Sequence, residues 1–221
     1  SQLPLLVQPP VRTNFGCAYD TRRDLVVLFG GMSSNVRGTA TYNNETWIFD
    51  GSTWIQQPFT TTAVTRVLEE TALADAVAVG PGMSRNADTV RFAHLQLPRL
   101  ERPAVLDADA LFAFSPPDHD LAAVLGKAPA PRIVTPHLGE MARLTGLLPS
   151  TLEASRVDVA KEWAKKWNCV LVLKGAPTVI ADPSGRVSVN PTGNPGMATA
   201  GMGDVLTGAI AALLAQKLSP W

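Results

Sequence analysis

The sequence of 221 residues predicts an α/β fold for residues 63–221, preceded by a small antiparallel β-sheet in residues 1–57. Two observations support this division. Beyond a junction at residues 58–62, helical patterns alternate with short apolar runs, which is typical of a sheet that is covered by helices. Before that junction, the apolar runs are short and are separated by turn residues, which favours hairpins.

Composition narrows the classes of protein to which this chain can belong. The formal charge is zero and no basic stripe occurs, so we expect no nucleic-acid partner. The chain has no apolar run of about eighteen residues, so we expect no membrane span, and its start lacks the pattern of a signal peptide. Cys17 and Cys169 do not suggest a disulfide framework, and Cys169 is expected to be a buried thiol. We therefore expect a cytoplasmic protein.

The N-terminal segment is expected to form four strands, at residues 15–19, 25–29, 46–49 and 53–56, with a turn at Asp50-Gly51. Its pattern resembles one blade of a kelch-type β-propeller. The matching positions are Arg12, Phe15, Tyr19, Asp20, Arg23, residues 27–31, Tyr42, Thr46, Trp47, Asp50, Gly51 and Trp54. A blade buries its faces against neighbouring blades, yet the pattern occurs once. The segment is therefore interpreted as a binding module, a lid on the second part, a grafted segment or a partly disordered sheet.

The second part is expected to alternate helices and strands. The helices are expected at residues 64–74, 136–145, 152–167 and 205–216, and the strands at residues 75–80, 103–106, 132–135, 170–175, 178–181 and 187–190. In the helix at residues 152–167, a solvated face is expected from Arg156, Lys161, Lys165 and Lys166. Because α/β sheets bind ligands at the carboxyl ends of their strands, the loops after four strands are expected to meet at one edge.

Polar and glycine residues follow the first two of these strands. Gly82 follows the first strand, where it either lets a ligand approach the backbone or forms a simple turn. Asp107 and Asp109 follow the second strand. Two carboxylates at a strand end can hold a hydroxyl group or a metal-bound water, although Asp109 can instead cap the next helix.

Titratable residues follow the next two strands. His137 and Glu140 are three residues apart and share one helix face, so they fit either a binding site or a capped helix. Lys174 ends the following strand beside a glycine. It can meet a phosphate group, or it can be a surface charge at the end of a strand.

A glycine-rich loop opens directly into an apolar helix over residues 190–216. Free N–H groups at such a helix start can hold an anion. Asp204 lies at that start, as either a helix cap or a general base beside an anion site. The chain lacks the phosphate-binding loop of P-loop NTPases and the complete Rossmann fingerprint. Close approach to a ligand is expected at four glycines, Gly193, Gly196, Gly201 and Gly203.

Five motifs together resemble those of the ADP/ATP-dependent NAD(P)H-hydrate dehydratases, which are repair enzymes of the ribokinase-like fold. His137 stands where the vitamin kinases of that fold tend to carry Asn, so it favours the dehydratases. The resemblance covers residues 64–221 and implies a three-layer sheet with helices on both faces. The motifs are Gly80-Pro81-Gly82, Asp107-Ala108-Asp109-Ala110-Leu111, Thr135-Pro136-His137-x-Gly139-Glu140, Leu173-Lys174-Gly175-Ala176-x-Thr178, and the run over residues 193–208.

The resemblance implies nucleotide-dependent repair of hydrated NADH or NADPH, with Mg²⁺ and with ADP or ATP as co-substrate. It implies that Asp204 is the base that activates the substrate hydroxyl for phosphorylation, after which phosphate leaves and the double bond is restored. It also implies a homo-oligomer. The implied substrate contacts are Gly82, Asp107, His137 and Asp204; the implied nucleotide contacts are Lys174, Gly175, Ala176, Pro177, Thr178, Asn194, Gly201 and Gly203; and Glu140 is implied to meet Mg²⁺ through the nucleotide.

Three departures from the family keep other interpretations open. The kelch-like segment stands in place of an earlier glycine-rich βα region, the family continues beyond the last residues of this chain, and Ser84 replaces a common glycine. The missing parts are expected to expose sheet edge and apolar surface. An inactive dehydratase-like domain, a vitamin-type small-molecule kinase of the same fold and a non-catalytic kelch-type binding protein remain alternatives.

Overall fold

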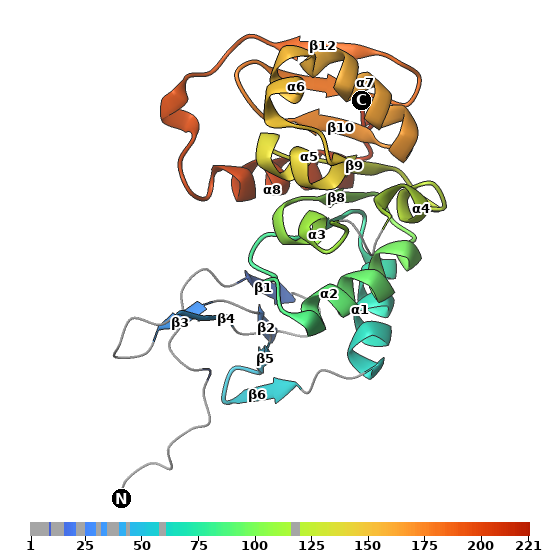
Figure 1. Ribbon diagram of the computed structural model, residues 1–221. Coiled ribbons are helices and arrows are strands. Elements are labelled where there is room, and N and C mark those ends of the chain that lie inside the picture. The colour runs from blue at the N-terminus through green and yellow to red at the C-terminus, as the bar shows by residue number, and fades with distance from the viewer. Residues whose placement is uncertain are drawn as a thin grey trace, which may run out of the picture.

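The computed structural model describes residues 9, 16–20, 25–29, 32–34, 40–42, 45–57, 61–115 and 120–221 (Figure 1). Several positions of the kelch-like pattern, together with junction residues 58–60, lie outside the described residues: Arg12, Phe15, Arg23, Gly30 and Gly31. The described residues form a six-stranded sheet, a four-stranded sheet and a separate two-stranded hairpin.

The N-terminal segment forms the four-stranded antiparallel sheet that the sequence predicts, with the strand order β1-β2-β5-β6. Asp50 closes its last hairpin by accepting hydrogen bonds from the N–H groups of Ser52 (2.9 Å) and Thr53 (2.8 Å). Trp47, which an isolated sheet would expose, is buried. The strands are β1 (Gly16–Asp20), β2 (Leu25–Phe29), β5 (Thr46–Phe49) and β6 (Trp54–Gln57), and the separate hairpin is β3 (Met32–Ser34) with β4 (Ala40–Tyr42).

The predicted α/β fold is confirmed for the second part of the chain. Its sheet has the order β12-β11-β10-β9-β8-β7, in which β7 to β10 run parallel and the last two strands form an antiparallel hairpin. All six strands are shorter than, or as long as, the sequence predicts. They are β7 (Val77–Val79), β8 (Ala104–Leu106), β9 (Arg132–Val134), β10 (Val170–Leu173), β11 (Thr178–Ala181) and β12 (Val187–Asn190).

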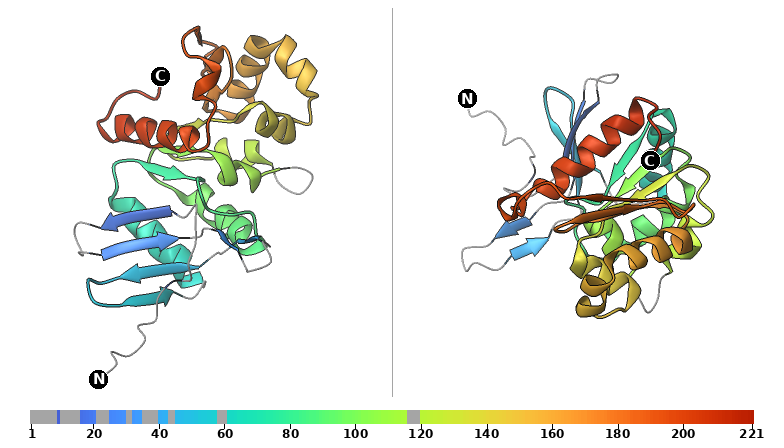
Figure 2. Two further views of the ribbon diagram at one scale, coloured as in Figure 1. Left: turned by 90° about the vertical axis from the view of Figure 1, so that its left-hand side faces the viewer. Right: turned by 90° about the horizontal axis from the view of Figure 1, so that it is seen from above.

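Helices cover both faces of this sheet, which gives three layers (Figure 2). Alternate side chains of a strand point to opposite faces, and β10 shows this clearly. Leu171 and Leu173 join the larger core with α2 to α7, whereas Val170 and Val172 pack with Leu214 of α8. The helices are α1 (Thr61–Leu73), α2 (Ala87–Gln96), α3 (Ala108–Phe112), α4 (Leu121–Leu125), α5 (Leu138–Thr145), α6 (Pro149–Ala154), α7 (Arg156–Trp167) and α8 (Met202–Ala215).

The prediction of a single helix at residues 152–167 is wrong. The structure divides this region at Ser155 into α6 and α7. Arg156 was expected on a solvated face with three lysines, but it is buried at 8% exposure. Its guanidinium donates to backbone carbonyl groups of another element, a long-range partner that a helical pattern does not reveal. The three lysines are exposed, as the sequence predicts.

The expectations for Cys169 and for membrane spans can also be compared with the structure. Cys169 is buried, and burial raises the pKa of its thiol well above the ordinary value. In the part of the chain that the structure describes, no helix combines the length and apolar character that crossing a membrane would require.

Truncation of a core side chain in β10 tests the packing of the sheet. Leu171 is fully buried, so Leu171→Ala is expected to lower the free energy of unfolding by about 2–5 kcal/mol through lost burial and a cavity. Val189→Ala on the edge strand β12 is the control, because that side chain is 44% exposed, and about 0.5 kcal/mol or less is expected. Urea unfolding measures both. Equal losses would contradict the assignment of Leu171 to the core.

The turn between β11 and β12 is expected to weaken in acid. Burial raises the pKa of Asp182, but hydrogen bonds from Ser184 and Arg186 and the charge of Arg186 outweigh it and hold that pKa below the ordinary value. The folded state therefore favours the carboxylate, so this stabilisation is present above about pH 4 and disappears as the pH falls through the folded pKa. Asp182→Asn should lose stability less steeply than the wild type below pH 4 in urea unfolding. Parallel pH profiles would argue against this contribution.

Candidate active site

The carboxylate of Asp107 joins three elements at the carboxyl edge of the sheet. It follows β8 and is 2% exposed. Its Oδ1 lies 2.8 Å from Nζ of Lys174, which follows β10, and its Oδ2 accepts a 3.0 Å hydrogen bond from Oγ1 of Thr207 in α8. Both oxygens are therefore engaged within the protein. Asp107 and Lys174 were both expected at one edge of the sheet, and the structure places them in contact there.

The loop after β7 packs closely against the same strand end. A Cβ atom at Gly80, which has φ of 130°, would lie 1.7 Å from the carbonyl oxygen of Asp107, so only glycine fits. Gly82, also at positive φ, lies partly exposed in this loop. Asp109 holds the loop by accepting from the N–H of Ser84 (3.0 Å) and from Nε of Arg85 (2.8 Å). This bracing role of Asp109 was not among the alternatives that the sequence suggested.

His137 and Glu140 form a capping box at the start of α5. Nδ1 of His137 accepts from the N–H groups of Gly139 (3.0 Å) and Glu140 (3.2 Å), and the Glu140 carboxylate accepts from the N–H of His137 (2.8 Å). Because Nδ1 is an acceptor, the proton of the neutral imidazole belongs on Nε2. The ring is 58% exposed, with Nε2 3.5 Å from the Glu140 carboxylate. The capped helix is thus confirmed, and it leaves an N–H group of His137 at the surface.

Glu140 connects this cap to the Asp107 cluster. Its side chain is 7% exposed and Oε2 lies 4.0 Å from Nζ of Lys174. Two buried carboxylates therefore share one ammonium group, and Asp107 holds it at the shorter distance. The described residues contain no group of three or more side chains that could hold a metal ion by themselves. A cation at this edge would need oxygen ligands from another molecule.

The start of α8 lies directly over this cluster. A Cβ atom at Gly203 would lie 3.4 Å from Oδ2 of Asp107 and 3.6 Å from Nζ of Lys174. The helix begins after Gly201 with no side-chain cap. Among the described residues, the N–H groups of Gly203 and Asp204 have no backbone acceptor. The Asp204 side chain is exposed and makes no hydrogen bond or ion pair with another described residue. The cap that the sequence left open for Asp204 is therefore absent.

Two loops border the helix start. Lys174 is fixed by its N–H, which donates to the carbonyl of Pro136 (2.9 Å), and Thr178 closes the next turn by donating from Oγ1 to the carbonyl of Gly175 (3.0 Å). In between, residues 175–177 are exposed. Asn194, in the glycine-rich loop, uses its side chain locally to accept from the N–H of Gly196 (2.9 Å). The structure gives no contact between Asn194 and the Asp107 cluster.

The structure thus brings together part of the predicted set. Lys174 lies near Asp107, Glu140 and Gly203, and Gly203 also lies near Asp107. Sequence reasoning missed Thr207, whose hydroxyl anchors α8. A signal for it existed, because threonine is an isolated polar side chain within the apolar run of residues 205–215.

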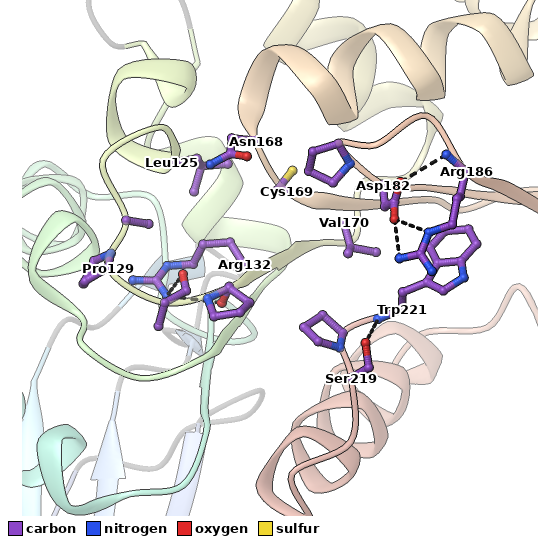
Figure 3. Close-up of a pocket in the computed structure, with 15 residues that line it drawn as sticks. Leu125, Pro129, Arg132, Asn168, Cys169, Val170, Asp182, Arg186, Ser219 and Trp221 are labelled. Atoms are coloured by element: carbon purple, nitrogen blue, oxygen red, sulfur yellow. Dashed lines mark hydrogen bonds and ion pairs between the residues drawn. The ribbon is translucent and has the colours of Figure 1, made fainter.

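A cavity lies at the other edge of the sheet (Figure 3). It measures about 410 Å³, and its lining includes Arg132 and Val170, the first residues of β9 and β10. Burial lowers the pKa of Arg132 to about 10. The guanidinium carbon of Arg186 lies over the ring of Trp221, 4.7 Å from the ring centroid. None of the predicted site residues lines this cavity. The candidate active site is therefore placed at the carboxyl edge of the sheet and not in this cavity.

Comparisons with known proteins identify the family. A family model described as NAD(P)H-hydrate dehydratase matches residues 39–221. The match begins before the predicted junction at residues 58–62 and so includes β5 and β6. Similar relatives include the bifunctional NAD(P)H-hydrate repair enzyme Nnr of Moorella thermoacetica, 50% identical over 72% of this chain and 29% of that protein. Another is the ADP-dependent (S)-NAD(P)H-hydrate dehydratase of Bacillus subtilis, 42% identical over 66% of this chain and 49% of that protein.

A solved structure extends the comparison to the fold. The ADP/ATP-dependent NAD(P)H-hydrate dehydratase from Bacillus subtilis, co-crystallized with ATP/Mg²⁺, matches with a TM-score of 0.56 and 37% identity, over 69% of this chain and 54% of that chain. The chain spans 29% of the length of the Moorella thermoacetica relative and 49% of the length of the Bacillus subtilis relative. Because the family model matches most of its residues, the chain belongs to the NAD(P)H-hydrate dehydratase family, on a ribokinase-like fold.

Proposed function

We propose that this chain binds an adenine nucleotide at the carboxyl edge of the sheet and uses it to dehydrate hydrated NADH or NADPH. The observation that carries the proposal is the start of α8, whose N–H groups at Gly203 and Asp204 have no backbone acceptor among the described residues, with Gly203 lying against Lys174. Such N–H groups and a nearby ammonium suit phosphate oxygens. The relatives are named for this activity.

Asp204 is proposed as the general base. It is exposed, has no partner among the described residues and stands beside the proposed phosphate site. It would take the proton of the substrate hydroxyl as the hydroxyl oxygen bonds to the terminal phosphorus and the phosphorus–oxygen bond to the rest of the nucleotide breaks. Phosphate then leaves with the carbon–oxygen bond pair, and a proton leaves the adjacent carbon to form the double bond. The N–H groups of the helix start hold the phosphate charge in both steps.

Lys174 to Thr178, with Asn194, Gly201 and Gly203, are proposed to contact the nucleotide. The exposed backbone of residues 175–177 and the exposed glycine-rich loop border the helix start. Gly82 and His137 are proposed to contact the substrate, and the N–H that His137 retains on Nε2 is a donor for that purpose. Since both oxygens of Asp107 are engaged, we propose that it acts on the substrate by positioning Lys174 and α8.

The residues fit a magnesium ion that arrives with the nucleotide. Mg²⁺ keeps several waters and binds through one or two carboxylates plus substrate phosphates. Glu140 offers one carboxylate in the cluster, with Oε1 3.5 Å from Nε2 of His137 and Oε2 4.0 Å from Nζ of Lys174. When bound, the ion would neutralise phosphate charge beside the acidic cluster. The relative's structure was obtained with ATP/Mg²⁺.

Other parts of the expected function are proposals as well. We also propose a domain boundary at residues 58–62 and a kelch-like nature for the N-terminal sheet. We propose a cytoplasmic location and assembly as a homo-oligomer as well. Native mass measurement of the purified chain would decide the assembly.

A vitamin-type kinase would release a stable phosphorylated alcohol, whereas the proposed enzyme regenerates NADH from its hydrate in the presence of ADP or ATP. Recovery of NADH absorbance distinguishes the two.

Substitution of Asp204 separates binding from chemistry. Asp204→Asn keeps the helix start and its N–H groups but removes the proposed base, so turnover is expected to fall by about 10²–10⁴-fold while ADP affinity changes little. Turnover is measured as recovery of NADH from its hydrate, and affinity by calorimetry. A variant with wild-type turnover would refute the role of Asp204.

Substitution of Gly203 tests the phosphate site. A valine there would place atoms next to Asp107 and Lys174, where even a Cβ lies at 3.4 Å and 3.6 Å. Gly203→Val is therefore expected to weaken ADP binding at least about tenfold. Gly208→Val in the same helix is the control, because its added Cβ would meet nothing within 4 Å. Calorimetry measures both. Equal ADP affinity in the two variants would mean that the nucleotide lies elsewhere.

Removal of the Asp107 charge tests the cluster itself. Asp107→Asn leaves Lys174 without its closest partner, and breaking a buried ion pair costs about 3–5 kcal/mol of unfolding free energy. Asp204→Asn is the matched control, since that carboxylate is exposed and a change within about 0.5 kcal/mol is expected. Urea unfolding measures both variants. Equal stabilities would show that the Asp107–Lys174 pair does not hold the edge together.

A further inference from the structure

Arg156 lies behind the turn that is proposed to contact the nucleotide. It is the first residue of α7 and is 8% exposed. Its Nη2 donates to the carbonyl oxygens of Leu173 (3.3 Å) and Lys174 (3.2 Å), where β10 ends. Its Nη1 pairs with Glu153 at 2.9 Å, and its Nε is buried without a hydrogen-bond partner. A buried guanidinium thus donates hydrogen bonds to the two backbone carbonyl groups on either side of the Lys174 Cα atom.

The glycine after Lys174 allows this contact. A Cβ atom at Gly175 would lie 2.2 Å from Nη2 of Arg156 and 2.8 Å from both Cζ and Nη1. The guanidinium therefore lies directly against the backbone at Gly175, and a larger residue at this position would displace it. Since residues 175–177 are exposed on the other side, Arg156 supports the turn from the interior.

Helix electrostatics do not account for this arginine. A cation at a helix N-terminus lies at the unfavourable end of the helix dipole. The ion pair with Glu153 is a weak reason for burial, because the Glu153 side chain is 56% exposed and such pairs contribute little. Burying a charge is costly unless hydrogen bonds compensate it. The two carbonyl groups of the turn are the contacts that compensate the burial of Arg156.

We propose that Arg156 is a positioning residue for nucleotide binding. By fixing the carbonyl groups of Leu173 and Lys174, it directs the Lys174 side chain toward Asp107 and holds the turn from Gly175 to Thr178 against the nucleotide. This inference rests on the proposed function, because the proposed function assigns the nucleotide as the ligand of the turn. It adds a residue that touches neither the nucleotide nor the substrate.

The experiment compares two ways of disturbing the same contact. Arg156→Met removes the guanidinium, and Gly175→Ala displaces it by the added Cβ while leaving it in the chain. Arg156→Lys keeps the charge but lacks the planar group that can bond both carbonyls. The control is Gly185→Ala, which also changes a glycine at positive φ in an exposed turn, but whose Cβ would meet nothing within 4 Å. Calorimetry with ADP and with hydrated NADH measures the affinities of the purified chain.

We expect Arg156→Met and Gly175→Ala each to weaken ADP binding by about tenfold or more, with hydrated-NADH affinity within about twofold of the wild type. Arg156→Lys should fall between Met and the wild type, and Gly185→Ala should bind ADP normally. A general loss of structure would weaken both ligands together, so equal losses overturn the proposal, as does unchanged ADP affinity in both variants. If Arg156→Met does not fold, Arg156→Lys decides together with Gly175→Ala, and unchanged ADP affinity in Arg156→Lys overturns the proposal.

A separate readout distinguishes failure of this inference from failure of the proposed function. If the wild-type chain binds no ADP, the proposed function is wrong, and amide hydrogen exchange decides whether Arg156 holds the turn. Faster exchange at residues 174–178 in Gly175→Ala, with unchanged exchange at residues 182–186, supports the positioning role. Unchanged exchange at residues 174–178 overturns it.

Discussion

The buried carboxylate of Asp107 is the contact on which the proposed site depends. One oxygen holds Lys174, 67 residues away in sequence, and the other holds Thr207, 100 residues away. These two bonds connect the ends of β8 and β10 and the first turns of α8. Because Gly203 lies against the same two side chains, the position of the free N–H groups at the helix start is set by Asp107. Local sequence preference alone could not place α8 there.

The balance of charge at this edge favours binding of the proposed nucleotide together with a divalent cation. Asp107, Glu140 and Asp204 are acidic, whereas Lys174 is the basic residue in contact with the first two. An uncompensated polyphosphate would meet carboxylates as well as N–H groups, so a divalent cation bound to the phosphates reduces the repulsion. On its outer side α8 exposes Val205 and Leu213, at 66% and 50%.

The sequence was sufficient for the six strands of the larger sheet in chain order and for the edge of the sheet where polar residues meet. Strand ends in a parallel sheet share one edge, so the motifs at Asp107, Glu140 and Lys174 could be grouped without coordinates. The burial of Arg156 could not be predicted in this way, because its partners are backbone carbonyls of β10 and the helical pattern placed it with exposed lysines. The bracing contact of Asp109 was missed for the same reason, since its partners lie 24 and 25 residues earlier.

We propose that the nucleotide binds at the edge of the sheet that Asp107 organises. Amide hydrogen exchange of the wild-type chain with and without ADP and Mg²⁺ tests this most directly, since it locates the ligand without any substitution. We expect slower exchange at residues 174–178 and 201–205, which border the Asp107 cluster, and no change at residues 182–186 beside the cavity at the opposite edge. Protection confined to residues 182–186 and the other cavity segments, or absent from residues 201–205, would contradict it.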